Sequence, residues 1–142
     1  MNSKIYEEYN HWLGQNEDSN WNEYITEQVA QGVLKKFNAE DWKLLHDTIL
    51  SMEQYWQERS AAALGELRSA DAIEILKLLL DSEFIEVSIA AASELDWTET
   101  PIETKHAEKI QNIIDQLPPE EIDYYPELYN LLEKAKKSDK NQ

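Results

Sequence analysis

Two stretches of the sequence decide the fold because they repeat each other: Trp56-Gln-Glu-Arg-Ser-Ala-Ala-Ala-Leu-Gly-Glu-Leu67 and Phe84-Ile-Glu-Val-Ser-Ile-Ala-Ala-Ala-Ser-Glu-Leu95. With an offset of 28 residues they are identical at Glu58/Glu86, Ser60/Ser88, Ala62/Ala90, Ala63/Ala91, Glu66/Glu94 and Leu67/Leu95. Repetition at a fixed period is typical of stacked units, since a single helical pair cannot bury its own apolar face. We therefore predict two helical hairpins whose small alanine side chains let the helix axes approach closely.

A strong helix-forming segment, residues 70–80, lies between the two repeats and ends at Asp81-Ser82. The run from Ser69 to Ala92 resembles a bacterial HEAT repeat of the short type, and residues 63–67 resemble the end of a preceding repeat. Ser88 departs from that pattern, because such repeats commonly carry arginine there. The resemblance implies an interaction scaffold, and a fold of this kind does not by itself define a chemistry.

Further helices are predicted from apolar residues at helical spacing and from end signals. They cover residues 3–13, 21–37, 39–52, 100–117 and 125–135. Their start signals are Asn20 with Glu23, Asn38, the capping box Thr100-Pro-Ile-Glu103 and Tyr125-Pro126, and their stop signals are Gly14 and Pro118-Pro119. No segment combines strand alternation with turn signals, so the predicted class is all-α.

We expect one domain over residues 1–142, built as a short right-handed stack of antiparallel helical hairpins, a HEAT-like α-solenoid with seven or eight helices. Repeat arrays need atypical units at their open ends. In this interpretation residues 1–38 form N-terminal capping helices, 39–97 two HEAT-like hairpins, 98–135 C-terminal capping helices and 136–142 a flexible tail.

The charge balance is strongly acidic, with 13 Lys and Arg against 29 Asp and Glu and a net charge of −16. Such a surface repels phosphate backbones, so we expect no direct binding of nucleic acid. It favours fast association with a basic protein. The chain has no cysteine, which excludes disulfides, zinc–thiolate sites and cysteine nucleophiles.

The N-terminal residues have neither a basic start nor an apolar run, and the longest unbroken apolar runs are of the Leu78-Leu-Leu80 kind. The sequence therefore predicts no secretory signal and no membrane span, and we expect a cytoplasmic protein. The sequence leaves the oligomeric state open, with a monomer as the default.

Metal binding is one candidate chemistry, because the motif Glu-x-x-His occurs at Glu8/His11 and Glu103/His106. Paired motifs of this kind on neighbouring helices build di-iron carboxylate sites. In so acidic a chain the spacing also arises by chance, and these two motifs lie toward opposite ends of the predicted stack. We expect no metal and no cofactor.

Hydrolysis by paired carboxylates is a second candidate, since five Trp and seven Tyr could stack on a sugar. Aromatic residues at helical spacing are more often core. The chain has no Ser-His-Asp order, no P-loop and only three glycines with which to build a dinucleotide turn. We expect no enzymatic activity.

An acidic protein-binding surface is the third candidate. On the second alanine-rich helix, Glu86 and Glu94 lie opposite the packing arc, and the offset aligns them with Glu58 and Glu66. No basic residue occurs between Lys77 and Lys105. The predicted partner-binding residues are Glu58, Glu66, Glu83, Glu86, Glu94, Asp96 and Trp97. A surface kept acidic only for solubility is the alternative.

A short, acidic, cysteine-free, all-α chain also resembles the immunity proteins of bacterial toxin–immunity pairs, including contact-dependent growth inhibition, some of which are HEAT-like. That resemblance implies binding and neutralisation of a basic nuclease toxin. Two alternatives remain open: a general HEAT-like adaptor or regulator without a toxin partner, and an enzyme of the phycobilin-lyase-associated HEAT type.

Overall fold

The fold is all-α in a computed structural model that describes residues 4–14, 18–98 and 102–138. These residues form nine α-helices and three short 3-10 helices, with no strand among them. The α-helices are α1 (Lys4–Leu13), α2 (Glu23–Gly32), α3 (Ala39–Thr48), α4 (Gln54–Leu67), α5 (Ala70–Leu79), α6 (Ile85–Trp97), α7 (Ala107–Gln116), α8 (Pro119–Ile122) and α9 (Pro126–Ser138); the 3-10 helices are η1 (Leu34–Lys36), η2 (Ile49–Ser51) and η3 (Thr104–His106). The predicted class is confirmed.

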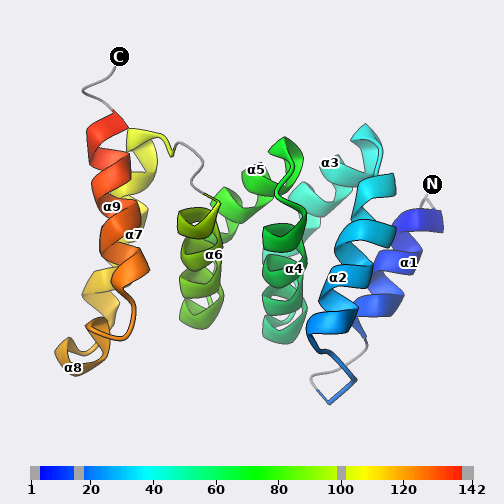
Figure 1. Cartoon of the computed structure of the whole chain (residues 1–142), viewed down its shortest axis with the longest axis horizontal. Helices are drawn as coiled ribbons and strands as arrows, with labels where there is room; N and C mark the ends of the chain where they lie inside the picture. The colour runs from blue at the N-terminus through cyan, green and yellow to red at the C-terminus, as the bar shows by residue number, and fades with distance from the viewer. Residues whose placement is uncertain (1–3, 15–17, 99–101, 139–142) are drawn as a thin grey trace.

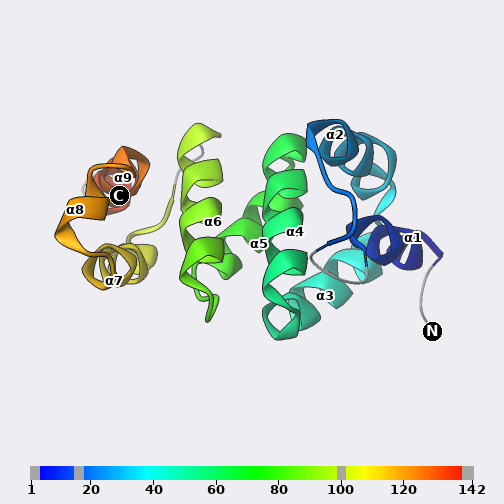
Figure 2. The same ribbon diagram turned by 90° about the horizontal axis from the view of Figure 1, so that it is seen from below.

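The helices lie in two rows (Figures 1 and 2). One row contains α2, α4, α6 and α9, each in contact with the next, and the other contains α1, α3, α5 and α7. The alanine-rich helices α4 and α6 are neighbours in the first row, and α5 contacts both of them. Helices α1 and α9 lie at opposite ends of the molecule (Figure 1).

Local start signals explain several helix boundaries. Asn38 caps α3 as predicted, and it also forms a capping box with Asp41: each side chain accepts a hydrogen bond of 2.9 Å from the other residue's backbone N–H. The predicted cap at Asn20 is wrong. Asn22 caps α2 instead, because its Oδ1 accepts from the N–H of Ile25 at 2.9 Å.

The predicted helix over residues 100–117 begins later than expected. Thr100 and Pro101 lie outside the described residues, and Glu103 is extended, with φ −72° and ψ 148°. Its carboxylate pairs with Lys77 of α5 at 2.9 Å, and η3 and then α7 follow.

The number of α-helices also differs from the expected seven or eight, and one reason is α8, a four-residue helix in the connector. Pro119 at its start and two acidic residues in its first turn favour a helix N-terminus there. At the other end, α9 continues to Ser138, three residues into the predicted tail, whose last four residues lie outside the described part of the chain.

The repeat places small residues in the core. Ala61 and Ala63 of α4 and Ala91 and Ala92 of α6 are fully buried. Larger side chains fill the space around them, including Trp56 and Tyr9, whose rings meet edge to face with centroids 5.5 Å apart. Interiors pack at the density of organic crystals, so this alternation of small and large side chains leaves little freedom for substitution.

Arg59 of α4 fastens the N-terminal pair of helices to the rest of the molecule. Its guanidinium donates hydrogen bonds to the carbonyl of Leu13 at 2.6 Å and to the carbonyl of Ser19 at 3.0 Å. It also lies over the rings of Trp21 and Tyr55, at 5.8 and 4.9 Å from their centroids. One buried side chain of α4 therefore contacts both the end of α1 and the residues that lead into α2.

Candidate protein-binding groove

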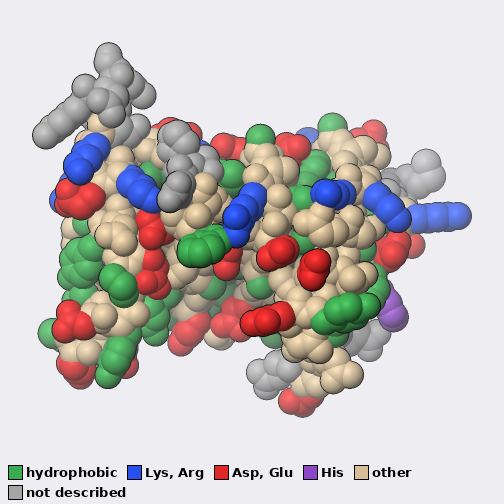
Figure 3. Space-filling model, in the orientation of Figure 1, with side chains coloured by type: hydrophobic (Ala, Val, Ile, Leu, Met, Phe, Trp, Pro, Cys, Tyr) green, Lys and Arg blue, Asp and Glu red, His purple; other side chains and the backbone are tan. Residues whose placement is uncertain are grey.

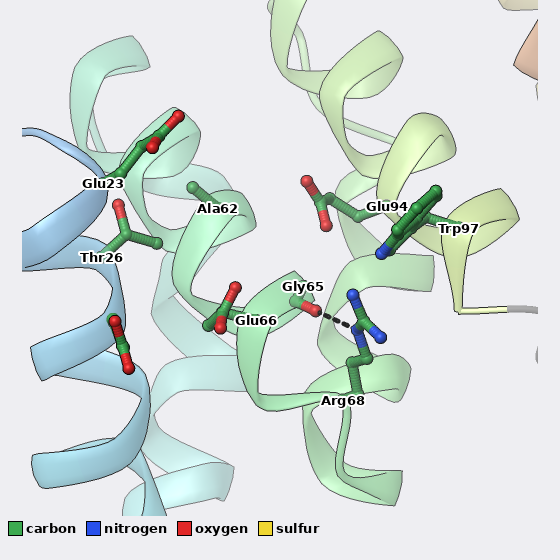
Figure 4. A pocket seen from close by; sticks show the side chains of 9 residues that line it. Glu23, Thr26, Ala62, Gly65, Glu66, Arg68, Glu94 and Trp97 are labelled. Carbon is green, nitrogen blue, oxygen red and sulfur yellow. Dashed lines mark hydrogen bonds between the residues drawn. The ribbon is translucent and has the colours of Figure 1, made fainter.

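A groove of about 500 Å³ opens between α2, α4 and α6. On the face seen in Figure 3, acidic side chains gather over α2 and α4, with a hydrophobic side chain and basic side chains beside them over α4 and α6. Figure 4 shows how the side chains are placed around the groove. It is lined by Glu23, Thr26 and Glu27 of α2, Ala62, Gly65 and Glu66 of α4, the α4 cap residue Arg68, and Glu94 and Trp97 of α6.

The carboxylates come from three helices that the repeat alone does not bring together. Glu23 and Glu27 are four residues apart on α2, so they share one face of that helix. Glu66 lies in the last turn of α4, and Glu94 lies in the last turn of α6. Within the described residues, no cation lies within 4.0 Å of Glu23, Glu27 or Glu66. The groove therefore carries negative charge without close internal compensation.

Glu94 lies against the backbone of α4. A Cβ atom on Gly65 would collide with the Glu94 side chain, so glycine at position 65 makes this close approach possible. Burial raises the pKa of the Glu94 carboxyl, and the nearby charge of Glu66 raises it further, while the positive charge of Arg68 lowers it. The groove lining thus contains a carboxylate that is partly removed from water.

Trp97 and Arg68 line the edge of the groove that lies across from Glu23 and Glu27 of α2. The indole of Trp97, at the end of α6, is 69% exposed, and the guanidinium carbon of Arg68 lies 5.7 Å from its ring centroid. Arg68 caps α4 in the left-handed region with φ 60°, where glycine is usual, and its Nε donates to the carbonyl of Gly65 at 3.0 Å. This backbone geometry carries the guanidinium back toward the groove.

The lining offers ion pairing and ring stacking. Among the described residues that line the groove there is no histidine, so the hydroxyl of Thr26 has no imidazole base beside it in this part of the chain. Carboxylates and an indole are groups that bind the basic side chains of proteins.

Three of the seven predicted partner-binding residues meet in this groove: Glu66, Glu94 and Trp97. Glu58 and Glu86 lie nearer the N-terminal ends of α4 and α6, and Glu83 precedes α6; none of these three lines the groove. Glu58 is half-buried and accepts a hydrogen bond from Gln54 at 3.1 Å. Their role in binding stays a prediction.

Asp96 lies on the other side of Trp97, in a second, adjacent pocket of about 750 Å³. Its carboxylate pairs with Lys134 of α9 at 2.7 Å. That pocket is lined by Arg68, Asp96, Trp97, Asn130, Glu133, Lys134 and Lys137. Trp97 therefore separates an acidic groove from a pocket of mixed charge.

Two acidic residues of the segment between Lys77 and Lys105 pair with distant lysines, which the sequence pattern did not indicate. Lys109 pairs with Asp81 at 2.6 Å, and Lys134 pairs with Asp96. The groove also contains residues that sequence reasoning missed, namely Glu23, Thr26, Glu27 and Arg68. The spacing of Glu23 and Glu27 was a usable signal, but their proximity to α4 depends on tertiary packing.

The two Glu-x-x-His motifs are far apart, on α1 and η3 at opposite ends of the molecule (Figure 1). Glu103 and His106 contact each other at 3.1 Å, and burial lowers the pKa of His106. In residues 4–14, 18–98 and 102–138, no group of three or more His, Asp or Glu side chains is placed to hold a metal ion. None of the described helices has both the length and the apolar character needed to cross a bilayer.

Comparison with known proteins gives no relative: the chain matches no family model, no curated protein and no solved structure.

Proposed function

We propose that this protein is an acidic protein-binding module whose groove between α2, α4 and α6 receives a basic partner. The observation that carries this proposal is the groove itself, whose lining combines four carboxylates with an exposed indole and a single arginine. Complementary charge speeds association, and a buried aromatic contact lengthens the lifetime of a complex.

The proposed architecture is a short right-handed stack of HEAT-like antiparallel hairpins, with α3 and α4 as one hairpin and α5 and α6 as the next. Two observations support it: the sequence identities between α4 and α6, and the contacts that each of these helices makes with its neighbours in the row. Stacked units of this kind present one helix of each unit on a shared surface, which is how repeat proteins build extended binding faces.

The proposed cellular role is that of an immunity protein, which binds a basic nuclease toxin in the cytoplasm and blocks it. A nuclease needs a basic surface to bind phosphates, and an acidic groove on a protein scaffold offers that surface a competing partner. The net charge of −16 favours rapid capture of such a partner.

Protection of cells is the direct test. Cells that express a basic nuclease domain encoded beside this gene should survive when the protein is co-expressed, and should die without it. If the protein gives no protection against any such neighbouring product, the immunity role is wrong, whereas binding of a basic non-toxic neighbour would support the adaptor role instead.

Charge reversal tests the groove. Glu27→Lys with Glu66→Lys should slow association with the basic partner roughly tenfold at low salt and flatten its salt dependence, as measured by stopped-flow mixing. The matched control is Glu120→Lys with Glu121→Lys, which makes the same change of charge on the exposed α8. Equal slowing by both pairs would show that net charge alone acts and that the groove is not the site.

A further inference from the structure

We propose that the groove takes an arginine side chain of its basic partner, which stacks on the Trp97 indole and replaces Arg68 there. This inference rests on the proposed function, because it names the group of the basic partner that enters the groove.

The indole of Trp97 already accepts a guanidinium. Arg68 places its guanidinium carbon 5.7 Å from the ring centroid, within the range of a cation–π interaction. Trp97 is nevertheless 69% exposed, so most of its surface remains open to a partner. Tryptophan is the best aromatic partner for a cation, and arginine stacks on aromatic faces more often than lysine.

The carboxylates beside the indole complete a site for a planar cation. Figure 4 shows Glu94 and Trp97 projecting from α6 on one side of the groove and Glu66 projecting from α4. A guanidinium can donate two parallel hydrogen bonds to a carboxylate, while an ammonium acts as a point charge. Arg68 is the single cation that lines this groove within the described part of the chain, against four glutamates. The charge therefore favours the entry of a second guanidinium.

The Arg68 guanidinium makes few contacts that would prevent its displacement from the Trp97 indole. Among the described residues its side chain makes one hydrogen bond, from Nε to the carbonyl of Gly65, and no carboxylate lies within 4.0 Å of its guanidinium. A residue that occupies a binding site in the free protein lowers the apparent affinity by the fraction of time for which the site is filled. Arg68 thus acts as an internal competitor for the partner's arginine.

The test uses two labelled peptides, hexa-arginine and hexa-lysine, with binding to the full chain followed by fluorescence anisotropy at physiological salt. The wild type should bind hexa-arginine about two- to fivefold more tightly than hexa-lysine, which is the contribution of one exposed cation–π contact. Trp97→Ala should remove this preference and leave the lysine affinity nearly unchanged, since it alters no charge.

Arg68→Gly provides the second arm. It should tighten binding of hexa-arginine by about two- to fivefold and increase the preference over hexa-lysine, because the competitor for the indole is gone. Glycine adopts the left-handed conformation at position 68 without a Cβ penalty, so the variant should fold. Lys43→Gln is the control: it removes one positive charge from the exposed surface of α3, whose residues do not line the groove.

Three outcomes decide the matter. If neither peptide binds any variant, the basic partner and the arginine site are both wrong. If both peptides bind the wild type equally, and Trp97→Ala and Arg68→Gly affect them equally, binding of a basic partner stands and the arginine site is wrong. The proposed site requires a preference for arginine that Trp97→Ala removes, that Arg68→Gly increases and that Lys43→Gln leaves unchanged.

Discussion

The helices α4 and α6 carry the same repeat but end in different surroundings. With the offset of 28 residues, Arg68 at the end of α4 corresponds to Asp96 near the end of α6. Arg68 is exposed, left-handed in φ and stacked on an exposed indole. The Asp96 side chain is 19% exposed and pairs with Lys134 of α9 at 2.7 Å. The C-terminal end of α4 is open to solvent, and we call it the open junction. The C-terminal end of α6 is covered by α9, and we call it the closed junction.

The difference follows from the place of each helix in its row. Helix α6 has α9 beside it, and the lysine of α9 neutralises the acid at the end of α6. Helix α4 lies between α2 and α6, and both of these neighbours present glutamates to its last turn. The same repeated sequence therefore lines a solvent-exposed groove at one unit and forms a structural contact at the next, according to the helices that lie beside it.

The largest expected difference between the two junctions is in the free energy of unfolding that is lost when the equivalent leucines, Leu67 and Leu95, are changed to alanine. Leu95 is 2% exposed, while Leu67 is only half-buried. Leu95→Ala should lower the free energy of unfolding by about 2–4 kcal/mol, and Leu67→Ala by about 1 kcal/mol, because the cost follows the buried volume that is lost. Urea denaturation monitored by circular dichroism measures both. Equal losses would contradict the difference in burial between the two ends.

The ion pair between Asp96 and Lys134 at the closed junction should contribute less to the free energy of unfolding than Leu95 does. A double-mutant cycle with Asp96→Asn and Lys134→Gln should give a coupling energy of about 1 kcal/mol, since the pair is partly screened from water. The same cycle on the more exposed pair Lys43 and Asp47, at 2.8 Å, serves as the control and should give a smaller coupling energy, because solvent screens it more strongly. A larger coupling at the exposed pair would show that the α9 contact does not close this junction.

The pH dependence of stability should reveal the partly buried carboxyl at the open junction. Because the pKa of Glu94 is raised above its ordinary value of 4.5, the folded state binds more protons than the unfolded state between these two values. Stability from protonated Glu94 is therefore fully present below pH 4.5 and is lost as the pH rises through the raised pKa. Glu94→Gln should gain stability relative to wild type over that interval.

Thermal unfolding of Glu94→Gln and wild type across pH 4 to 8 measures this gain, which is the smallest of the three effects. Glu86→Gln, at an exposed position of the same helix, controls for the removal of one carboxylate from α6. A stability difference between Glu94→Gln and wild type that does not change with pH would mean that the Glu94 carboxyl is not partly buried against Gly65.

The sequence predicted the features that depend on neighbours along the chain. The burial of Ala63, Ala91 and Leu95 follows from helical periodicity within a single helix. The cap at Asn38 depends on a residue only three positions away. Asn20 and Asn22 are both good caps, and the sequence did not distinguish them, because the choice depends on how the residues before α2 are held against α4.

The candidate groove could be predicted only in part. Glu66, Glu94 and Trp97 were found because the repeat places α4 and α6 in equivalent orientations. The residues that α2 contributes to the groove could be predicted only if it were known which helix lies next to α4, and the repeated sequence does not indicate this. The repeat also did not indicate the ion pair between Lys134 and Asp96, which are 38 residues apart in the sequence. Because this pair neutralises Asp96, the unpaired acidic residues that the structure describes in the groove are those of α2, α4 and α6.

The hydrogen bonds that Arg59 donates should influence how the N-terminal helices unfold locally. Because this side chain fastens both the end of α1 and the residues that lead into α2, these two helices should detach together as one cooperative unit in native-state hydrogen exchange. That unit carries Glu23 and Glu27, one wall of the groove. A partner bound in the groove would therefore slow amide exchange throughout α1, a helix that contributes no residue to the groove lining.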